Sequence, residues 1–290
     1  MRPPAAFSRD TSSGGNVLQN LNTCYNGSAS PCTGTAIALP IARRTVIDQA
    51  GASGVECEHD YFYSAYGLLT EQDDYDYGAN IPSTPLRKTL ITYAPLTNGI
   101  VSAPQTIKIE EGSGTLRSQT TYTYAQGTPV TTSTPQHVAV SGSRGNPTTI
   151  AYLVQGSTSL TKTNTYYDTG NVQTATDFNG AATSYTYGFC GNSFVSNTSK
   201  PLSLSTSAAW NCNGGVQTSA TDENSHADTT SYTDAEFWRP FSTTDRTGAV
   251  TQFTYTGQNS VESVTTVSSG SAAVDVLQLF QPAQSAGAAR

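Results

Sequence analysis

The chain has 290 residues and a formal net charge of −7, and only 12% of its residues are charged. The length allows one large domain or two ordinary ones, and the charged share is about half of what globular proteins usually carry. An acidic balance without a basic run argues against a nucleic-acid partner. No apolar stretch approaches the roughly 20 residues that a membrane helix needs, so no membrane span is expected.

Threonine and serine take the place of the missing charged residues, and methionine occurs once. Thr and Tyr fit a pleated, half-buried surface better than they fit a helix. A polar chain rich in Gly and Ser can also be disordered, but disordered segments are poor in aromatic residues. This chain has 16 Tyr, nine Phe and two Trp. The composition therefore predicts an all-β fold.

Residues 1–55 show little regularity and are expected to form an irregular N-terminal segment of Gly-, Pro- and Ser-rich loops. The first ten residues, MRPPAAFSRD, lack the apolar region of a signal peptide, so no signal peptide is expected in this chain.

Five cysteines are widely spaced along the chain, without a CxxC pair or a histidine in ligand register, so a zinc site is not expected. They are Cys24, Cys32, Cys57, Cys190 and Cys212. Two disulfides with one free thiol and five unpaired cysteines are both open, because the compartment decides between them. If disulfides form, the expected pairs are Cys24 with Cys32 and Cys190 with Cys212, since each pair could join the arms of one hairpin.

Two acidic stretches follow the first cysteines. In the first, carboxylates alternate as polar side chains on the solvent face of a strand would; they are Glu56, Glu58 and Asp60. The second has the oxygen ligands that calcium prefers, but not the spacing of an EF-hand; it consists of Glu71, Asp73, Asp74 and Asp76. A solvated strand and turn is the favoured interpretation, and calcium binding is the alternative. No cofactor is expected.

Alternation and turn signals recur along the rest of the chain, and helical periodicity is almost absent. Six segments in which Thr alternates with aromatic or β-branched residues are predicted strands. They are 89–93, 106–110, 120–124, 163–167, 183–187 and 251–255. Gly-, Asn- and Asp-rich segments between them predict turns. We therefore expect diverged repeats over 56–141, clearer repeats over 142–257, and a final strand with a loose or truncated tail over 258–290.

Three segments align without gaps on Asp177, Asp222 and Asp245. A small residue stands three positions after each Asp, and a Tyr stands ten positions after it. The residues at these positions are Gly180, Ser225 and Gly248, then Tyr187, Tyr232 and Tyr255. An aromatic residue also stands eight positions after the first and third Asp, as Tyr185 and Phe253. Recurrence of this kind indicates a repeat protein.

The repeated unit predicts a hairpin. The Asp accepts hydrogen bonds from backbone groups just ahead of it, and Gly supplies a positive φ. The aromatic residues then lie two positions apart on one face of the next strand. Neighbouring copies are expected to bury these rings, because an isolated hairpin is marginal in water. A catalytic role for the three Asp residues is disfavoured, because a catalytic carboxylate is not usually repeated in every unit.

Residues 165–188, TYYDTGNVQTATDFNGAATSYTYG, resemble the YD repeat of the RHS family. Tyr167 and Asp168 match the pair that names the repeat. The remaining matches are Gly170, Asp177, Gly180, Thr183, Tyr185 and Tyr187, and Gly215 holds the position of Gly170 in the next copy. Residues 237–257 match the later part of the repeat, with Phe253 and Tyr255 as its aromatic pair.

RHS/YD-repeat proteins include the shells of Tc toxin complexes, bacterial RHS polymorphic toxins and teneurin ectodomains. The resemblance implies a curved, solenoid-like sheet of hairpins that acts as a non-enzymatic scaffold, secreted or at the cell surface. Its partners would be a toxin domain or the rest of an RHS shell. Because the chain shows neither the Asp-rich self-cleaving segment nor a toxin domain, we expect a shell fragment or a degenerate member. The alternative is an adhesion module that binds carbohydrate or a cell surface.

No enzymatic activity is expected. The histidines, His59, His137 and His226, lie near no nucleophile or metalloprotease motif. The scaffold and adhesion hypotheses differ in their predictions for the repeated Tyr rings. A scaffold should bury them between hairpins, whereas stacking on sugars requires a row of exposed rings.

Overall fold

The computed structural model describes residues 7–13, 16–30, 32–51, 54–135, 137–188, 190–233, 237–255, 260–268 and 271–279. These residues form twenty β-strands and one short 3₁₀ turn. No helix within these ranges is long and apolar enough to span a membrane. The prediction of an all-β series of antiparallel hairpins is therefore confirmed. Five of the six predicted strand segments lie wholly within observed strands, and the segment 163–167 extends one residue past the end of β10.

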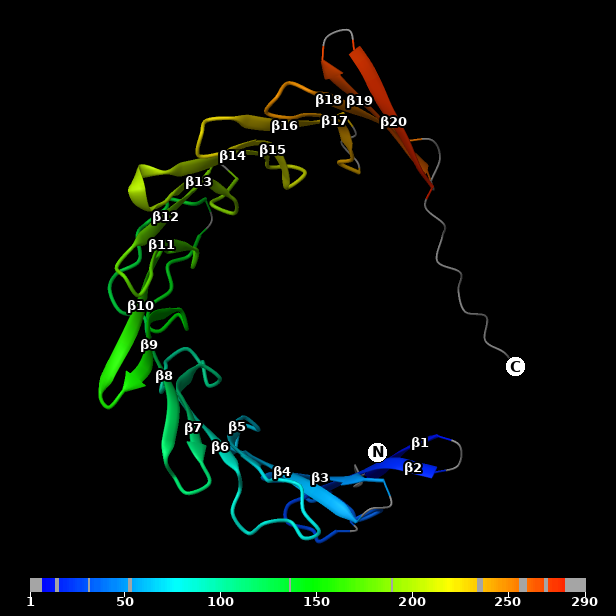
Figure 1. The fold of residues 1–290 in the computed structure, drawn as a ribbon. Helices are drawn as coiled ribbons and strands as arrows, with labels where there is room; N and C mark the ends of the chain where they lie inside the picture. Colours follow the sequence, from blue (N-terminus) through cyan, green and yellow to red (C-terminus); the bar gives the residue numbers. More distant parts are fainter. Residues whose placement is uncertain are drawn as a thin grey trace. The chain divides into compact units, whose positions relative to one another are not determined.

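The chain divides into two compact units. Unit 1 is Met1–Thr128 with Ala139–Asn164, and unit 2 is Pro129–Val138 with Thr165–Arg290. In each unit the strands pair antiparallel in chain order and form a single twisted, curved layer (Figure 1).

Unit 1 contains β1 to β9 and most of β10. Their bounds are β1 Phe7–Ser13, β2 Asn16–Tyr25, β3 Arg43–Ala50, β4 Val55–Tyr63, β5 Leu69–Asp74, β6 Arg87–Tyr93, β7 Pro104–Glu111, β8 Leu116–Tyr124, β9 Pro147–Gln155 and β10 Thr158–Tyr166. Unit 2 continues with shorter strands, which are β11 Val172–Thr176, β12 Ala182–Tyr187, β13 Val195–Ser199, β14 Ser205–Asn211, β15 Val216–Thr221, β16 Ala227–Tyr232, β17 Pro240–Thr244, β18 Val250–Tyr255, β19 Ser260–Ser268 and β20 Ser271–Leu279. The 3₁₀ turn η1, Pro201–Ser203, lies between β13 and β14.

A single layer leaves little room for an apolar core. The buried hydrophobic side chains among the described residues are Cys24, Cys32, Ile47, Cys57, Ala94 and Ala249. Most other strand residues are half-buried. Stability must therefore come mainly from the strand ladders, the turns and the side chains that pair across neighbouring strands.

The two ends of the chain differ from the sequence-based expectation. β1, β2 and β3 lie in the segment 1–55 that we expected to be irregular, and β2 pairs with β3 over seven residues from Gln19 to Tyr25. Pairing with a neighbour decides strand formation here, because β-propensity depends strongly on context. β19 and β20 occupy most of 258–279. The described residues do not include 1–6, where no signal peptide was expected, or 280–290, where a loose tail was expected.

Candidate functional site

The three aligned Asp residues begin the same five-residue turn. The Asp177 amide donates to the carbonyl of Ala181 at 3.0 Å, and Asp177 Oδ1 accepts from the amides of Asn179 and Ala181 at 2.8 and 3.0 Å. Asp222 and Asp245 make the same backbone bond at 2.9 and 3.0 Å and accept the same two amide bonds. Each Asp therefore caps the turn of its own hairpin.

The residue three positions after each Asp has left-handed backbone geometry. The φ values are +79° for Gly180, +64° for Ser225 and +85° for Gly248. Glycine reaches this region without strain, whereas an L-residue such as Ser does so at a cost. The lapse from Gly to Ser in the middle copy therefore keeps the turn and adds strain to it.

A fourth copy of the unit lies between the first two. The Lys200 amide donates to the carbonyl of Leu204 at 2.8 Å, and Ser203 has a φ of +60°. Trp210 stands ten positions after Lys200, where the other copies have Tyr. The sequence alignment missed this copy because Lys, Ser and Trp replace Asp, Gly and Tyr. Asp222 and Asp245 are 23 residues apart, and the residue 23 positions after Asp177 is Lys200. This spacing is the signal in the sequence that could have revealed the fourth copy.

In three of these hairpins the aromatic residue that follows the turn bonds back to the backbone of the preceding strand. The donor lies near the end of the second strand, and the acceptor lies near the start of the first strand of the same hairpin. The bonds are Trp210 Nε1 to Val195 O at 2.8 Å, Tyr232 Oη to Gln217 O at 3.1 Å and Tyr255 Oη to Pro240 O at 2.9 Å. Each bond spans 15 residues and pins the open end of its hairpin. We call these bonds aromatic pins.

The same device occurs in unit 1, where the repeats are too diverged to align. Tyr93 Oη donates to Leu69 O at 2.7 Å, and Tyr124 Oη donates to Pro104 O at 2.6 Å. At both tyrosines the register to the next strand shifts, as it also does at Tyr187, Trp210 and Tyr232. Such bulges increase local twist and bend a strand. Pin and bulge coincide at Tyr93, Tyr124, Trp210 and Tyr232, whereas Tyr255 has a pin without a register shift.

The rings of Tyr187, Tyr232 and Tyr255 are half-buried. They are neither buried between hairpins, as the scaffold hypothesis predicted, nor exposed in a row, as sugar stacking requires. In a single-layer sheet each ring lies on the strands beneath it and no second layer packs over it, which explains the intermediate burial. Tyr187 packs edge-on against Tyr167, with the ring centroids 5.7 Å apart. Tyr185 and Phe253 are half-buried as well.

The Tyr167–Asp168 pair performs two tasks. Tyr167 begins a turn in which its amide donates to Asn171 O at 2.8 Å, and Gly170 has a φ of +90°. Asp168 Oδ1 accepts from the hydroxyl and the amide of Thr132 at 2.7 and 3.1 Å. The Thr132 hydroxyl lowers the pKa of Asp168. Asp168 thus holds Thr132 beside the turn. Gly215, which has a φ of +63°, closes the turn between β14 and β15, where its amide donates to Asn211 O at 2.9 Å.

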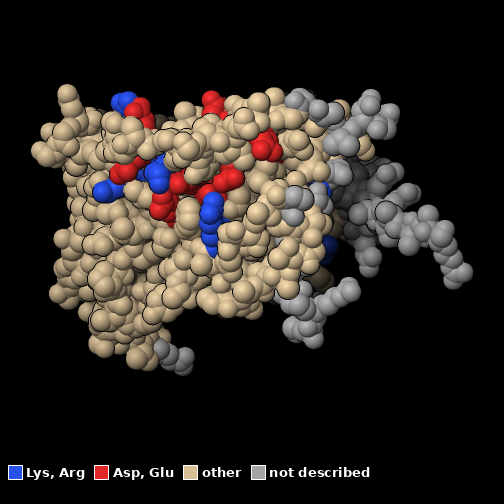
Figure 2. Space-filling model, turned by 90° about the horizontal axis from the view of Figure 1, so that it is seen from below, with Lys and Arg blue, Asp and Glu red and all other residues tan. Residues whose placement is uncertain are grey.

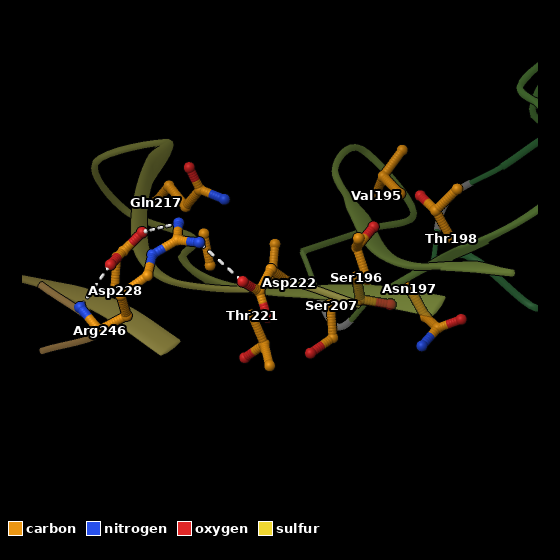
Figure 3. A pocket seen from close by; sticks show the side chains of 13 residues that line it. Val195, Ser196, Asn197, Thr198, Ser207, Gln217, Thr221, Asp222, Asp228 and Arg246 are labelled. Atoms are coloured by element: carbon orange, nitrogen blue, oxygen red, sulfur yellow. Dashed lines mark hydrogen bonds and ion pairs between the residues drawn. The ribbon is translucent and has the colours of Figure 1, made fainter. Parts of the chain in front are cut away.

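A pocket of about 250 Å³ lies over β13 to β16 (Figure 3). Arg246, from the Asp245 turn, donates to Asp222 Oδ2 at 2.7 Å and to Asp228 Oδ2 at 2.8 Å. Its hydrogen bond to Asp228 lowers the pKa of that carboxylate. Lys200 donates to Glu223 at 2.5 Å in the same manner. These ion pairs link successive turns, and the carboxylates of the pocket are already engaged by protein groups.

The charged face of unit 1 contains a buried ion pair. Asp60 is 1% exposed and accepts from Arg43 Nε at 2.9 Å, from Arg43 Nη2 at 2.5 Å and from the Thr45 hydroxyl at 2.5 Å. Burial and a hydrogen bond to Asp60 raise the pKa of Glu58 to about 7. The expectation that Glu56, Glu58 and Asp60 line a solvent face is therefore wrong for Asp60.

The second acidic stretch is also paired rather than solvated. Asp73 is 5% exposed and lies 3.1 Å from Lys88 Nζ, and Asp74 accepts from Arg87 at 2.7 Å. Figure 2 shows acidic and basic side chains gathered side by side on the face that it presents. Within the described part of the chain, no group of three or more His, Cys, Asp or Glu side chains could hold a metal ion.

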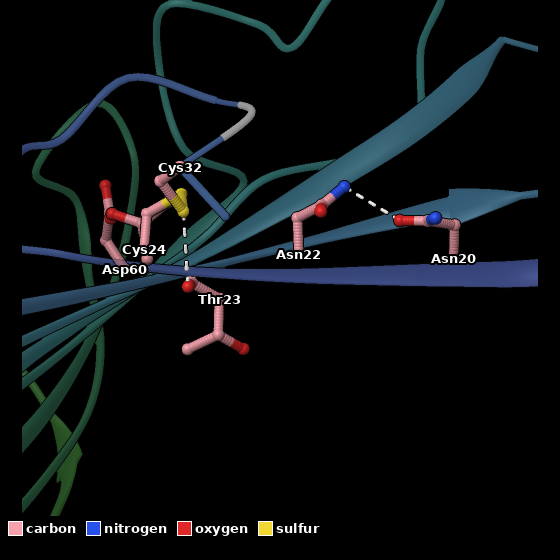
Figure 4. Close-up of a disulfide and its surroundings, with 7 residues drawn as sticks. Asn20, Asn22, Thr23, Cys24, Cys32 and Asp60 are labelled. Atoms are coloured by element: carbon pink, nitrogen blue, oxygen red, sulfur yellow. Dashed lines mark hydrogen bonds between the residues drawn. A yellow bond between two sulfur atoms is a disulfide. The ribbon is translucent and has the colours of Figure 1, made fainter. Parts of the chain in front are cut away.

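The structure joins both expected cysteine pairs. Cys24 is bonded to Cys32 and Cys190 to Cys212, while Cys57 is free and buried. The second disulfide flanks the hairpin of β13 and β14, as expected of a bond between hairpin arms. The first instead ties β2 to the loop that follows it, and Figure 4 shows it beside Asp60. In the strand register Cys24 lies opposite Thr45, and Thr45 lies opposite Asp60, so Cys24 and Asp60 share one face of the sheet.

Cys57, His59 and Asp74 lie in the order of a nucleophile, a base and an orienting carboxylate. His59 Nδ1 lies 2.8 Å from Asp74 Oδ1, and His59 Nε2 lies 3.8 Å from Cys57 Sγ. Cys57 is 3% exposed, and burial raises the pKa of its thiol. A reactive cysteine needs a lowered pKa and access to substrate, so the geometry does not favour catalysis.

The other two histidines each lie near one carboxylate. His226 Nδ1 lies 3.8 Å from Asp222 Oδ2, and His137 Nε2 lies 3.9 Å from Asp168 Oδ2.

No protein-family model and no curated protein matches the sequence. The crystal structure of TcdB2-TccC3-TEV aligns with a TM-score of 0.47 and 11% identity, over 86% of this chain and 15% of that chain. TcdB2-TccC3 without its hypervariable C-terminal region aligns with a TM-score of 0.47 and 10% identity, over 88% and 16%. A porin-like protein from Bacteroides uniformis aligns with a TM-score of 0.25 and 11% identity, over 90% and 93%. Likenesses of this strength say nothing about function.

Proposed function

We propose that this chain is a non-enzymatic β scaffold that forms one arc of the wall of an RHS/YD-repeat shell. The observation that carries the proposal is the fourfold recurrence of one hairpin unit in unit 2, with its turn closed at Asp177, Lys200, Asp222 and Asp245. A position that binds or reacts with a substrate is not usually repeated in every unit, whereas a position that builds the wall must be.

The contacts within and between hairpins also suit a wall. Phe194 stacks on Trp210 at the open end of the β13–β14 hairpin, with the ring centroids 4.7 Å apart, and Arg246 and Lys200 link the turns of neighbouring hairpins. The exposed strand positions are mostly Thr and Ser. A wall with such a surface can face an unfolded or inhibited cargo without offering it a contiguous apolar patch.

The rest of such a shell, and a toxin domain inside it, are the partners that fit this proposal. The two disulfides suit secretion or the cell surface, because disulfides persist in oxidising compartments. The sequence resemblance to YD repeats supports the same partners and location.

The second candidate function is adhesion to carbohydrate. It is favoured by two exposed rings, Phe237 just before β17 and Phe241 within it, which are 70% and 46% exposed. Exposed aromatic faces of this kind are typical of surfaces that bind a partner.

A glycan array followed by titration calorimetry separates the two functions. The scaffold proposal predicts no saturable binding to any glycan. Saturable binding that is lost in Phe237→Ala or Phe241→Ala would overturn it. Tyr66→Ala is the matched control, because Tyr66 is 74% exposed but lies in unit 1, away from these two rings in the chain.

A further inference from the structure

Unit 1 contains a pocket of about 390 Å³ between the β2–β3 loop and the β4–β5 turn. Its lining residues are apolar or aromatic except for a single arginine. They are Tyr25, Leu39, Pro40, Ile41, Arg44, Tyr63 and Gly67. A pocket of this size and composition is typical of sites for small organic ligands, in which one or two polar groups fix the orientation.

The loop wall of this pocket is held by Asn26. Its Nδ2 donates to the carbonyls of Ala38 and Pro40 at 2.8 and 3.3 Å. Its Oδ1 accepts from the amides of Ala42 and Arg43 at 2.8 and 3.2 Å. One side chain therefore fixes the backbone on both sides of Leu39–Ile41, so the wall is formed before any ligand arrives.

The other two walls are also fixed. Tyr25 packs against the disulfide between Cys24 and Cys32. Gly67 belongs to a turn in which its amide donates a hydrogen bond to Ser64 O at 2.9 Å. The Ser64 hydroxyl accepts a hydrogen bond from the amide of Leu68 at 3.3 Å. A preformed pocket binds with a smaller ordering cost than one that must assemble around its ligand.

Arg44 differs from its neighbour Arg43. Successive strand residues point to opposite faces, and Arg43 pairs with Asp60 on the charged face. On the other face, Arg44 lies between Tyr25 and Tyr61 in the strand register, and its guanidinium carbon is 4.2 Å from the centre of the Tyr61 ring. No ion pair joins Arg44 to a carboxylate of the described residues, and its buried Nε has no hydrogen-bond partner among them.

We propose that this pocket binds a small carboxylate with an apolar body, and that Arg44 pairs with the carboxylate group. Guanidinium and carboxylate form the strongest common charge-assisted hydrogen bonds, and stacking on Tyr61 orients the guanidinium plane. The Leu39–Ile41 loop, Tyr25 and Tyr63 receive the apolar body. Two sources supply this chemistry, namely a free monocarboxylic acid and the C-terminus of a polypeptide that ends in an apolar residue.

Titration calorimetry on the full chain tests the proposal with 4-phenylbutyrate and with the tetrapeptide Ala-Ala-Leu-Phe as probes. Each probe has a neutral partner of the same shape, 4-phenylbutan-1-ol and the amidated tetrapeptide. At least one acid is expected to bind about tenfold or more tightly than its neutral partner, since a charge-assisted bond is lost. Binding of the peptide alone identifies a polypeptide C-terminus as the source, and binding of phenylbutyrate alone identifies a free acid.

Two variants keep the test independent of folding. Arg44→Gln is expected to lower the affinity for the acid about tenfold and to leave the affinity for the alcohol unchanged. Leu39 is 72% exposed and lines the pocket, whereas Leu202 is 91% exposed in unit 2, so Leu39→Ala should weaken binding and Leu202→Ala should not. The proposal is overturned if neither acid binds at 10 mM, roughly the weak limit for such small ligands. The proposal is also overturned if each acid binds with the same affinity as its neutral partner. The same holds if wild type, Arg44→Gln and Leu39→Ala all bind the acid with equal affinity.

Discussion

Removal of one aromatic pin should have a measurable and bounded effect on stability. In Tyr255→Phe only the hydroxyl that donates to Pro240 O at 2.9 Å is lost, while the ring keeps its place 4.6 Å from the Arg239 guanidinium carbon. A hydrogen bond of this kind contributes about 0.5–1.5 kcal/mol net. Because Tyr255 is only half-buried, water can partly replace the lost donor. We therefore expect the free energy of unfolding to fall by about 1 kcal/mol.

Urea unfolding followed by circular dichroism measures this change as a shift of the midpoint at constant slope. Tyr66→Phe is the control, because the Tyr66 ring is 74% exposed and its substitution should change the free energy of unfolding by less than about 0.3 kcal/mol. If Tyr255→Phe is as stable as wild type, or if Tyr66→Phe loses as much, then the pin contributes nothing and our account of hairpin closure is wrong.

Three further predictions concern the turns, the charged face and the second disulfide. In urea melts Ser225→Gly should raise the free energy of unfolding by about 0.5 kcal/mol, and Gly248→Ser should lower it by about 1 kcal/mol, because both positions have positive φ. A Cβ at Gly248 meets no atom within 4 Å, so the loss there comes from backbone strain and not from a clash. The pKa of Glu58 is raised in the fold from 4.5 to about 7, so its neutral form stabilises the fold below pH 4.5, and up to about 3 kcal/mol is lost as the pH rises through 7. In Glu58→Gln, unfolding midpoints measured across this range should lose that slope, and an unchanged slope would exclude Glu58 as its source. Replacing both Cys190 and Cys212 by Ala removes the disulfide that joins two positions 22 residues apart. The free energy of unfolding should fall by about 3 kcal/mol in the same melts, and an unchanged value would show that the disulfide does not constrain the unfolded chain.

The hairpin unit could be predicted wherever its residues keep their chemical identity. Asp177 and Gly180 specify their turn locally, because an Asp cap and a positive-φ Gly act within five residues. The copy at Lys200 escaped the alignment because its residue types differ and only part of its backbone preserves the unit. The closing bond from Lys200 N to Leu204 O and the positive φ of Ser203 are kept, whereas Leu202 adds a second positive φ. Ser203 accepts the left-handed conformation that Gly adopts elsewhere, and the Trp210 indole donates where the others use a hydroxyl.

Burial on the charged face could not be predicted from alternation. Asp60 follows Glu58 and Glu56 at every second position of its strand, and this alternation is the pattern of a solvent face. Its burial is tolerated because Arg43 and Thr45 on the adjacent strand satisfy its oxygens, and Cys24 follows on the same face one strand further along the register. These partners lie 15 to 36 residues away in the chain, so no local pattern reports them. The same holds for Arg44, whose pocket is built from two loops and three strands.

Amide hydrogen exchange tests the four-copy account most directly. The turn-closing amides of Asp177, Lys200, Asp222 and Asp245 each donate to the carbonyl four residues ahead, at 2.8 to 3.0 Å. If the four hairpins are copies of one structural unit, all four amides should be protected to a similar extent, by about 100-fold or more over the unfolded chain. Protection at the three Asp residues with free exchange at Lys200 would contradict the account, since the wall would then have a gap where the fourth copy is placed.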